Sequence, residues 1–484
     1  MSDPRRRPPR RRGHRAGGDP ARSAAFAALR AVDVQGAYTN LVLPALLGSR
    51  GLGGRDAAFV TELVSGTVRR RGTYDAVLAA VLDRPPDLLD PAVLDALRMG
   101  AHQLLAMRVP AHAAVATTVD LVRAEVGHGP AGLVNAVLRK VSEHDLPGWV
   151  RRVAPDPAAD PVGFAAVAYS HPRWVVELLS AALHPGSSAL GPVHAAEQSR
   201  TNAEGGELDR LLEADNAPPK VTLVARPGLA SVAELVAAGG TATRWSPYGV
   251  QLAAGDPRDV PAVLEGRAGV QDEGSQVVAL ALARASVPGA DTRWLDLCAG
   301  PGGKAALLAA LAGQRGARLL AAERAPHRSR LVASATAAVG DGLLGVVTAD
   351  GTRPAWRSNR FDRVLLDAPC TGLGALRRRP EARWRRRPED IDDLVRLQRR
   401  LLDAAVDSAR AGGVVAYVTC SPVLAETSGV VAAALAERPD VRLEDATPLL
   451  ADVPDTAGPL PGTVQLWPHV HGTDAMFLAL LRKV

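Results

Sequence analysis

The chain has 484 residues, of which 47% are hydrophobic, enough to fill the cores of roughly three domains. No apolar run approaches the ~18 residues of a membrane-spanning helix, and no signal-peptide core follows the N-terminus, so we expect a soluble, cytoplasmic protein without membrane contact. Three cysteines argue against a disulfide framework, whereas a net charge of +6, carried mainly by arginine, favours a polyanionic partner such as nucleic acid.

The first part of the chain is predicted to be a tail followed by helices. Residues 1–20 combine Pro, Gly and Arg with almost no apolar side chain, which predicts a disordered basic arm. Residues 21–145 carry apolar residues at helical spacing, and Asp90 followed by Pro91 is typical of a helix start. The apolar stripes are Val60, Leu63, Val64 and Val68; Leu94, Leu97, Ala101, Leu104 and Leu105; and Val134, Val137, Leu138 and Val141. We interpret these stripes as the core of an all-helical domain.

The rest of the chain is predicted to form two mixed domains. Residues 146–265 contain a helix near 172–183 and a strand at 221–224, which indicates a small α+β domain. From residue 266 to 484, apolar strands alternate with helices, as in a mostly parallel, Rossmann-like α/β sheet. The strands are predicted at 294–298, 318–322, 345–348, 363–367 and 414–419.

A glycine-rich loop, AGPGGK at residues 299–304, follows the first of these strands. Ligands bind at the carboxyl ends of strands in such sheets. A phosphate-binding Walker loop is excluded because Cys298 and Ala305 occupy its Gly and Ser/Thr positions, and the dinucleotide fingerprint is not matched either. The next two strands lead to Glu323 and Asp350, which suit a ribose diol and an adenine amino group. Together these features predict a site for S-adenosylmethionine (SAM).

Two cysteines lie where the fourth and fifth strands end. Cys370 stands in DAPCTGLG, which begins at Asp367, and Cys420 stands in TCSP. A thiolate that adds to C6 of a pyrimidine turns C5 into a carbon able to accept a methyl group. An acid near N3 would stabilise the developing charge, and a base must then remove the C5 proton. The residues by themselves do not decide which thiol attacks.

Other interpretations of the two cysteines remain open at this stage. A free cysteine is often a small buried hydrophobe, and two nearby thiols could form a regulatory disulfide. A zinc site would need about four ligands at suitable spacing, which these cysteines do not supply, so no metal is predicted.

These motifs together resemble the Sun/RsmB (Fmu) family of RNA 5-methylcytosine methyltransferases. The resemblance rests on DLCAGPGGK, Glu323, Asp350, DAPCTGLG and TCSP, and it extends over nearly the whole chain. NAVLRKV at 135–141 resembles the NusB-type RNA-binding domain of bacterial members, and YSHPRW at 169–174 and VQDEGSQ at 270–276 also match. The resemblance implies a NusB-like all-α domain, a small α+β domain and a SAM-dependent methyltransferase domain.

The resemblance also implies roles for individual residues. Cys420 would be the nucleophile and Cys370 would assist release of the product, while Asp367 and Lys304 would also face the cytosine. The SAM-binding residues would be Cys298, Ala299, Gly300, Pro301, Gly302, Gly303, Lys304, Glu323, Asp350 and Asp367. The expected substrate is a cytosine of 16S ribosomal RNA in the small subunit, and the expected state is a monomer. What activates Cys420 is not visible in the sequence.

The chain departs from the family pattern at a few positions. Gly300 stands where Ala is common, Ala305 where Thr is common, and Glu323 replaces the usual Asp. HGTDAMF at 471–477 replaces a run that resembles GxDGFF, which leaves the C-terminal substrate contact open.

An arginine-rich stretch, residues 375–390, follows the Cys370 motif and surrounds Trp384. Arginine beside an aromatic ring can hold phosphates and stack an unpaired base, so we expect this stretch to contact RNA, with the target base single-stranded or flipped out. The alternatives are the same chemistry on tRNA, a non-catalytic RNA-binding assembly or transcription factor, and, less favoured, DNA methylation.

Overall fold

The computed structural model describes residues 19–185 and 206–484, and the chain divides into two compact units, 1–154 and 155–484. The predicted basic arm therefore lies outside the described residues except for its last two. The domain boundaries expected at 145/146 and 265/266 stay predictions. Among the described residues, no helix combines the length and the apolar character that crossing a membrane requires.

The first unit is helical throughout its described part. Asp90 caps α5 as expected, since its Oδ1 accepts from the backbone N–H of Ala92 at 2.7 Å. The three predicted stripes are buried, except that Leu104 and Leu105 at the end of α5 are half-buried. The elements are α1 (Pro20–Val34), α2 (Thr39–Ser49), α3 (Gly54–Arg69), α4 (Arg71–Val81), η1 (Pro86–Leu88), α5 (Pro91–Leu105), α6 (Ala111–Glu125), α7 (Ala131–Val141) and α8 (Leu146–Val153).

The second unit begins with helices and a small antiparallel sheet of strand order β2-β3-β1-β4. The predicted helix and strand correspond to α10 and β1, and β4, which follows the predicted boundary at 265/266, pairs with β1. The elements are α9 (Pro161–Ala168), α10 (Arg173–Leu183), α12 (Glu207–Asn216), β1 (Thr222–Ala225), α13 (Val232–Ala237), β2 (Gly240–Ala242), β3 (Gly249–Leu252), η3 (Pro257–Asp259), α14 (Pro261–Leu264) and β4 (Ala268–Val270).

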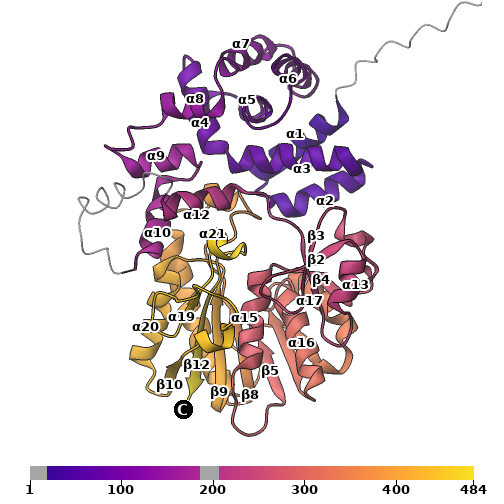
Figure 1. The fold of residues 1–484 in the computed structure, drawn as a ribbon, viewed down its shortest axis with the longest axis vertical. Helices are drawn as coiled ribbons and strands as arrows, with labels where there is room; N and C mark the ends of the chain where they lie inside the picture. Colours follow the sequence, from indigo (N-terminus) through magenta and orange to yellow (C-terminus); the bar gives the residue numbers. More distant parts are fainter. Residues whose placement is uncertain (1–18, 186–205) are drawn as a thin grey trace, which may run out of the picture. The chain divides into compact units, whose positions relative to one another are not determined.

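A larger, mostly parallel sheet of order β10-β12-β9-β8-β5-β6-β7 follows, with β11 paired to β12 (Figure 1). Strands β5 to β9 are the five predicted ones, and they pair with one another in parallel. The antiparallel strands β10, β11 and β12 were not predicted. The strands are β5 (Arg293–Asp296), β6 (Arg318–Glu323), β7 (Leu343–Thr348), β8 (Phe361–Asp367), β9 (Ala409–Thr419), β10 (Val441–Glu444), β11 (Val464–Gln465) and β12 (Phe477–Lys483).

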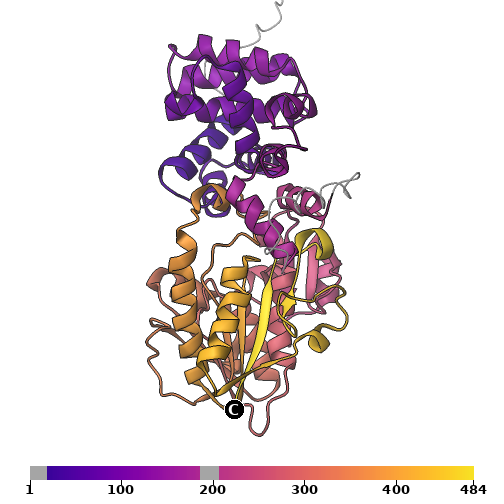
Figure 2. The same cartoon turned by 90° about the vertical axis from the view of Figure 1, so that its left-hand side faces the viewer.

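Helices cover both faces of this sheet, as Figures 1 and 2 show. Along β8 the side chain of Leu365 packs into the core beneath α15 and α16, whereas Val364 and Leu366 pack beneath α19 and α20. Because β5 to β9 pair with one another in parallel, their carboxyl ends and the loops that follow them lie at one edge of the sheet. The remaining elements are α15 (Glu273–Arg284), α16 (Gly303–Gln314), α17 (Pro326–Thr336), η4 (Ala337–Gly342), α18 (Ala382–Arg385), α19 (Asp390–Ser408), η5 (Leu424–Glu426), α20 (Ser428–Glu437), η6 (Thr447–Leu450) and α21 (Pro468–His471).

Candidate active site

The glycine-rich loop connects β5 to α16 and is anchored to the end of β6. The Gly300 N–H donates to Glu323 Oε2 at 3.1 Å. Gly302 has a φ of 115°, and a Cβ at this position would lie 2.6 Å from the Cβ of Ala335, so only glycine fits there. The loop therefore brings bare backbone to the sheet edge, where a ligand can approach closely.

Two departures from the family pattern, Gly300 and Glu323, occupy the same space. A Cβ on Gly300 would lie 2.1 Å from Glu323 Oε2. Glu323 Oε1 accepts from the Ala325 N–H at 2.9 Å, and Arg328 donates to the Gly300 carbonyl at 2.6 Å. The longer acid thus fills the room that an alanine side chain at 300 would need.

The three predicted acids lie along this edge. Glu323, 6% exposed, ends β6 and Asp367 ends β8, while Asp350 lies just beyond β7 and is exposed. The backbone N–H of Thr352 donates to Asp350 Oδ1 at 2.9 Å and lowers the pKa of that carboxyl group. The strand order β8-β5-β6-β7 thus places Asp367 on one side of the strand that leads into the glycine-rich loop, and Glu323 and Asp350 on the other.

Lys304, in the first turn of α16, is paired with Asp367. Its Nζ lies 2.9 Å from Asp367 Oδ2 and donates to Ser275 Oγ at 3.3 Å. Burial by itself would lower the pKa of Lys304, but the carboxylate of Asp367 more than offsets this and raises it. Lys304 is therefore an ammonium group held at the end of β8.

The two predicted thiols meet at this site. Cys370 Sγ lies 3.5 Å from Cys420 Sγ, and Cys370 is buried while Cys420 is partly exposed. The hydrogen bond with Cys370 lowers the pKa of Cys420, against the opposing effects of burial and of Asp367, and Lys304 adds to the lowering. The same hydrogen bond, together with burial, raises the pKa of Cys370 well above its ordinary range. The two thiols are therefore electrostatically unequal, since the pKa of Cys420 is lowered and that of Cys370 is raised.

The third cysteine, Cys298, lies at the start of the glycine-rich loop. Burial raises the pKa of its thiol well above the ordinary value, and the side chain packs against the core beneath α19. Its backbone N–H donates to Asp296 Oδ1 at 3.3 Å. Asp296 escaped the sequence analysis, although it stands at the end of the first strand; burial, followed by Asp367, raises its pKa to about 8.

Gln271 is a second residue that the sequence analysis did not single out as functional, although it lies within VQDEGSQ. Its side chain is 7% exposed, and neither amide atom has a hydrogen-bond partner among the described residues. A Cβ on Gly303 would lie 3.7 Å from Gln271 Cδ, so this amide lies beside the start of α16. Leaving a buried polar group unpaired costs about 1–3 kcal/mol, which a polar ligand in the loop would recover.

Comparison with known proteins decides the family. A family model described as 16S rRNA methyltransferase RsmB/F matches residues 283–482, and a NusB family model matches residues 19–143. The ribosomal RNA small subunit methyltransferase B of Pseudomonas putida is 34% identical over 430 residues, which are 87% of this chain and 90% of that protein. The chain belongs to the RsmB/F family.

Further likenesses agree with this assignment. A protein of Mycobacterium tuberculosis, strain H37Rv, whose name describes it as a methyltransferase, is 52% identical over 482 residues, 99% of each chain. The crystal structure of PH0851 shares the fold, with a TM-score of 0.75 and 22% identity over 96% of this chain and 99% of that one. The expected fold class is confirmed, and this RsmB/F protein is a SAM-dependent RNA methyltransferase.

The residues of the loop fit SAM. A ribose diol and an adenine amino group are hydrogen-bond donors that suit Glu323 and Asp350, and the unpaired amide of Gln271 offers a donor and an acceptor to an amino-acid end. No group of three or more His, Cys, Asp or Glu side chains in the described part of the chain could hold a metal ion. The site thus has the donors and acceptors that this cofactor needs.

The arginine-rich stretch of this RsmB/F protein is built largely into the fold, which corrects part of the RNA-contact prediction. Arg383 is 0% exposed and donates to the Ser170 carbonyl at 3.1 Å and to Asn216 Oδ1 at 2.9 Å. Arg386 donates to the carbonyl oxygens of Thr371 and Cys370 at 3.1 and 3.3 Å. Arg383 thus ties the stretch to residues beside α10 and α12, whereas Arg386, which is partly exposed, ties it to the Cys370 loop.

Arg378 shows what the unusual C-terminal run does. It forms ion pairs with Asp272 and with Asp474 of HGTDAMF, and the Asp474 backbone N–H donates to Asp272 Oδ1 at 3.0 Å. Burial raises the pKa of Asp474 to about 6, and Asp272 adds to this. The run therefore joins the arginine stretch to the start of α15, while Arg379 and Arg387 of the same stretch are exposed.

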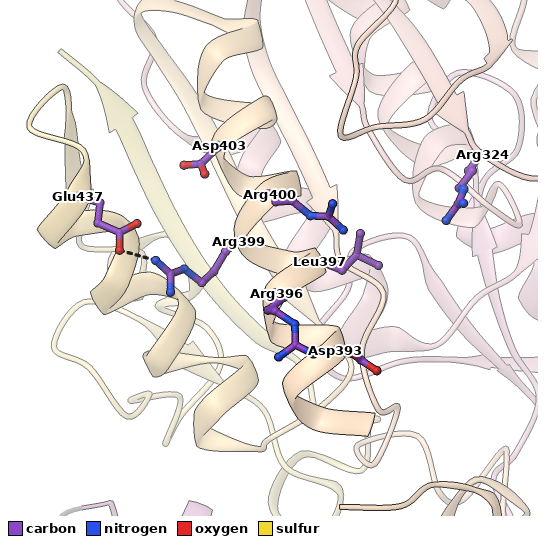
Figure 3. A pocket seen from close by; sticks show the side chains of 8 residues that line it. All are labelled: Arg324, Asp393, Arg396, Leu397, Arg399, Arg400, Asp403 and Glu437. Carbon is purple, nitrogen blue, oxygen red and sulfur yellow. Dashed lines mark hydrogen bonds and ion pairs between the residues drawn. The ribbon is translucent and has the colours of Figure 1, made fainter. Parts of the chain in front are cut away.

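A groove of about 710 Å³ lies along α19 (Figure 3). Its arginines are partly neutralised, because Arg399 pairs with Glu437 and Arg396 pairs with Asp393. The lining residues are Arg324, Asp393, Arg396, Leu397, Arg399, Arg400, Asp403 and Glu437. The lining includes neither of the paired thiols nor a residue of the glycine-rich loop, so the groove is not the reaction site.

Proposed function

We propose that this enzyme methylates C5 of a cytosine in 16S rRNA of the small ribosomal subunit, as a cytoplasmic monomer. Cys420 is the nucleophile, and Cys370 assists release. The observation that carries the proposal is the thiol pair, 3.5 Å apart, in which the pKa of Cys420 is lowered and that of Cys370 is raised. The name of the Pseudomonas putida relative supports ribosomal RNA as the substrate.

The first step follows from the state of Cys420. Its thiolate adds to C6 of the cytosine, a C–S bond forms, and the electrons of the C5–C6 double bond move to C5 and toward N3. Lys304 and Asp367, held together at 2.9 Å, face the base, and the ammonium group stabilises the developing negative charge. SAM, when bound, supplies an electrophilic methyl group for C5.

The last step returns Cys420 to its initial state. A base removes the C5 proton, the electrons re-form the double bond, and the C–S bond breaks to release a thiolate. Cys370, whose thiol contacts Cys420 in the free enzyme, is the group placed to assist this release. We assign SAM binding to residues 298–304 with Glu323, Asp350 and Asp367.

Single-turnover methylation of RNA tests the two roles. Cys420→Ser should abolish methyl transfer, and a wild-type rate in this variant would exclude covalent catalysis by Cys420. Cys370→Ala should accumulate a protein–RNA adduct that survives SDS, whereas rapid turnover without an adduct would exclude the release role. Bisulfite sequencing of rRNA and tRNA from cells with and without the gene identifies the substrate.

A further inference from the structure

One buried carboxyl group, that of Glu426, connects the loops that carry the two thiols. Glu426 is 0% exposed, and four donors converge on it. Its Oε1 accepts from the Thr371 N–H at 2.8 Å and from Gln398 Nε2 at 3.0 Å. Its Oε2 accepts from Thr371 Oγ1 at 2.5 Å and from Ser421 Oγ at 2.6 Å.

Three of these four donors belong to the residues that directly follow the two cysteines. Thr371 follows Cys370, and Ser421 follows Cys420, and their hydroxyl oxygens lie 3.0 Å apart. The two cysteines are 50 residues apart in the sequence and end different strands. Beyond Asp367 and Val418, where the pairing of β8 with β9 ends, the Gly374 N–H still donates to the Cys420 carbonyl at 2.9 Å. The carboxyl group of Glu426 adds side-chain connections directly beside the two cysteines.

Glu426 is itself held in place from two sides. The Tyr417 hydroxyl, on β9, donates to the Glu426 carbonyl at 2.7 Å. Gln398, on α19, also donates to the Pro369 carbonyl at 2.9 Å, so it ties the same carboxyl group to the residue before Cys370. No lysine, arginine or histidine forms an ion pair with Glu426 in the part of the chain that the structure describes. A buried carboxyl group without a cation is costly, and the loop donors are what compensate it.

We propose that Glu426 is a positioning residue that sets the spacing of Cys370 and Cys420, so that attack and release act on one bound base. The inference rests on the proposed function, because only a reaction that uses both thiols needs this spacing. A displacement of about 1 Å can cost about 100-fold in rate when reacting groups must be aligned.

The test compares Glu426→Ala and Glu426→Gln in single-turnover reactions with RNA and saturating SAM. E426A should form the Cys420 adduct about 100-fold more slowly. E426Q should stay within about tenfold of the wild type, because the amide keeps the shape and the hydroxyls of Thr371 and Ser421 can turn to accept its N–H. SAM affinity should not change in either variant.

Glu437→Ala is the matched control, since Glu437 is exposed at the end of α20 and pairs with Arg399 at the surface. It should leave all rates unchanged. Wild-type adduct formation in E426A would overturn the proposal. So would an E426Q variant as slow as E426A, since Glu426 would then act through its charge and not through the spacing that it sets.

A second measurement reports the spacing without any methylation. Diamide oxidises the two thiols, which lose two protons and two electrons to form a disulfide, while diamide is reduced to the hydrazine. Mass spectrometry of the linked peptides should show this disulfide forming at least tenfold more slowly in E426A than in the wild type. Ser421→Ala, which removes one donor, should slow it less and serves if E426A does not fold. Equal rates in all variants would overturn the proposal, whereas a wild-type enzyme that methylates no RNA would refute only the proposed function.

Discussion

Gly300 and Glu323 are mutually dependent: a Cβ on Gly300 would lie 2.1 Å from Glu323 Oε2, which instead accepts a hydrogen bond from the Gly300 N–H. Family members commonly carry Ala and Asp at these positions. The shorter acid leaves room for a methyl group, and the longer acid needs a glycine. Two apparently separate departures are therefore one structural exchange.

This exchange predicts a compensating pair of substitutions. Gly300→Ala should push Glu323 from its place and weaken SAM binding about tenfold or more, equal to about 1.4 kcal/mol. The double variant G300A/E323D should recover to within about threefold of the wild type, because the shorter acid makes room for the methyl group. Isothermal titration calorimetry with SAM measures both. A double variant as weak as G300A would show that the positions are independent.

The thiol pair predicts how the reactivity of Cys420 depends on pH. Only the thiolate is alkylated, so the rate rises as pH passes the pKa of Cys420, which the hydrogen bond with Cys370 holds below the ordinary value. Cys370→Ala removes this donor and should move the inflection to higher pH. The rate of iodoacetamide labelling of Cys420, followed by peptide mass spectrometry, gives the curve. An unchanged inflection would mean that Cys370 does not activate Cys420.

Asp296 predicts a pH dependence of stability. Its pKa in the folded protein is about 8, whereas an unfolded aspartate titrates near about 4. Between these values the folded state binds the extra proton, so Asp296 makes the free energy of unfolding fall as pH rises through this window, by up to about 1.4 kcal/mol per pH unit. Asp296→Asn should flatten that fall. Urea unfolding of both proteins at several pH values checks it, and parallel curves would contradict the burial of an uncharged Asp296.

The arginine stretch predicts two separable effects. Arg383→Ala should lower the free energy of unfolding by about 3 kcal/mol or more, because Ser170 and Asn216 lose a buried charged donor. Arg387 is exposed, so Arg387→Ala should change stability by less than about 0.5 kcal/mol. It should instead reduce the slope of the logarithm of the RNA-binding constant against the logarithm of salt concentration by about one, the amount expected for one lost phosphate contact. Denaturant titration measures the first effect, and filter binding at several salt concentrations measures the second. An R383A variant that is as stable as the wild type but binds RNA more weakly would show that Arg383 contacts RNA.

Much of the fold was predictable because its signals are local. The five strands from β5 to β9 are recognisable in the sequence as apolar runs. Asp90 followed by Pro91 indicates the start of α5 from two adjacent residues. The short strands β10 and β11 and the last strand β12 were missed, since their pairing depends on β9 and on one another rather than on their own pattern. Asp296 was missed for the same reason: its raised pKa comes from burial and from Asp367, 71 positions further along the chain.

The sequence by itself determined that a glycine-rich loop, two acids and two cysteines follow successive apolar strands. If such strands pair in parallel, the segments that follow them lie at one edge of the sheet. Only the tertiary structure brings the two thiols together, because Cys370 Sγ lies 3.5 Å from Cys420 Sγ although the residues are 50 positions apart, and this hydrogen bond lowers the pKa of Cys420 and raises that of Cys370. It also decided that Arg383 is internal and that Glu426 joins both loops. The residue type does not reveal whether a charged side chain is exposed or buried, because the partners that compensate its burial come from segments distant in the sequence.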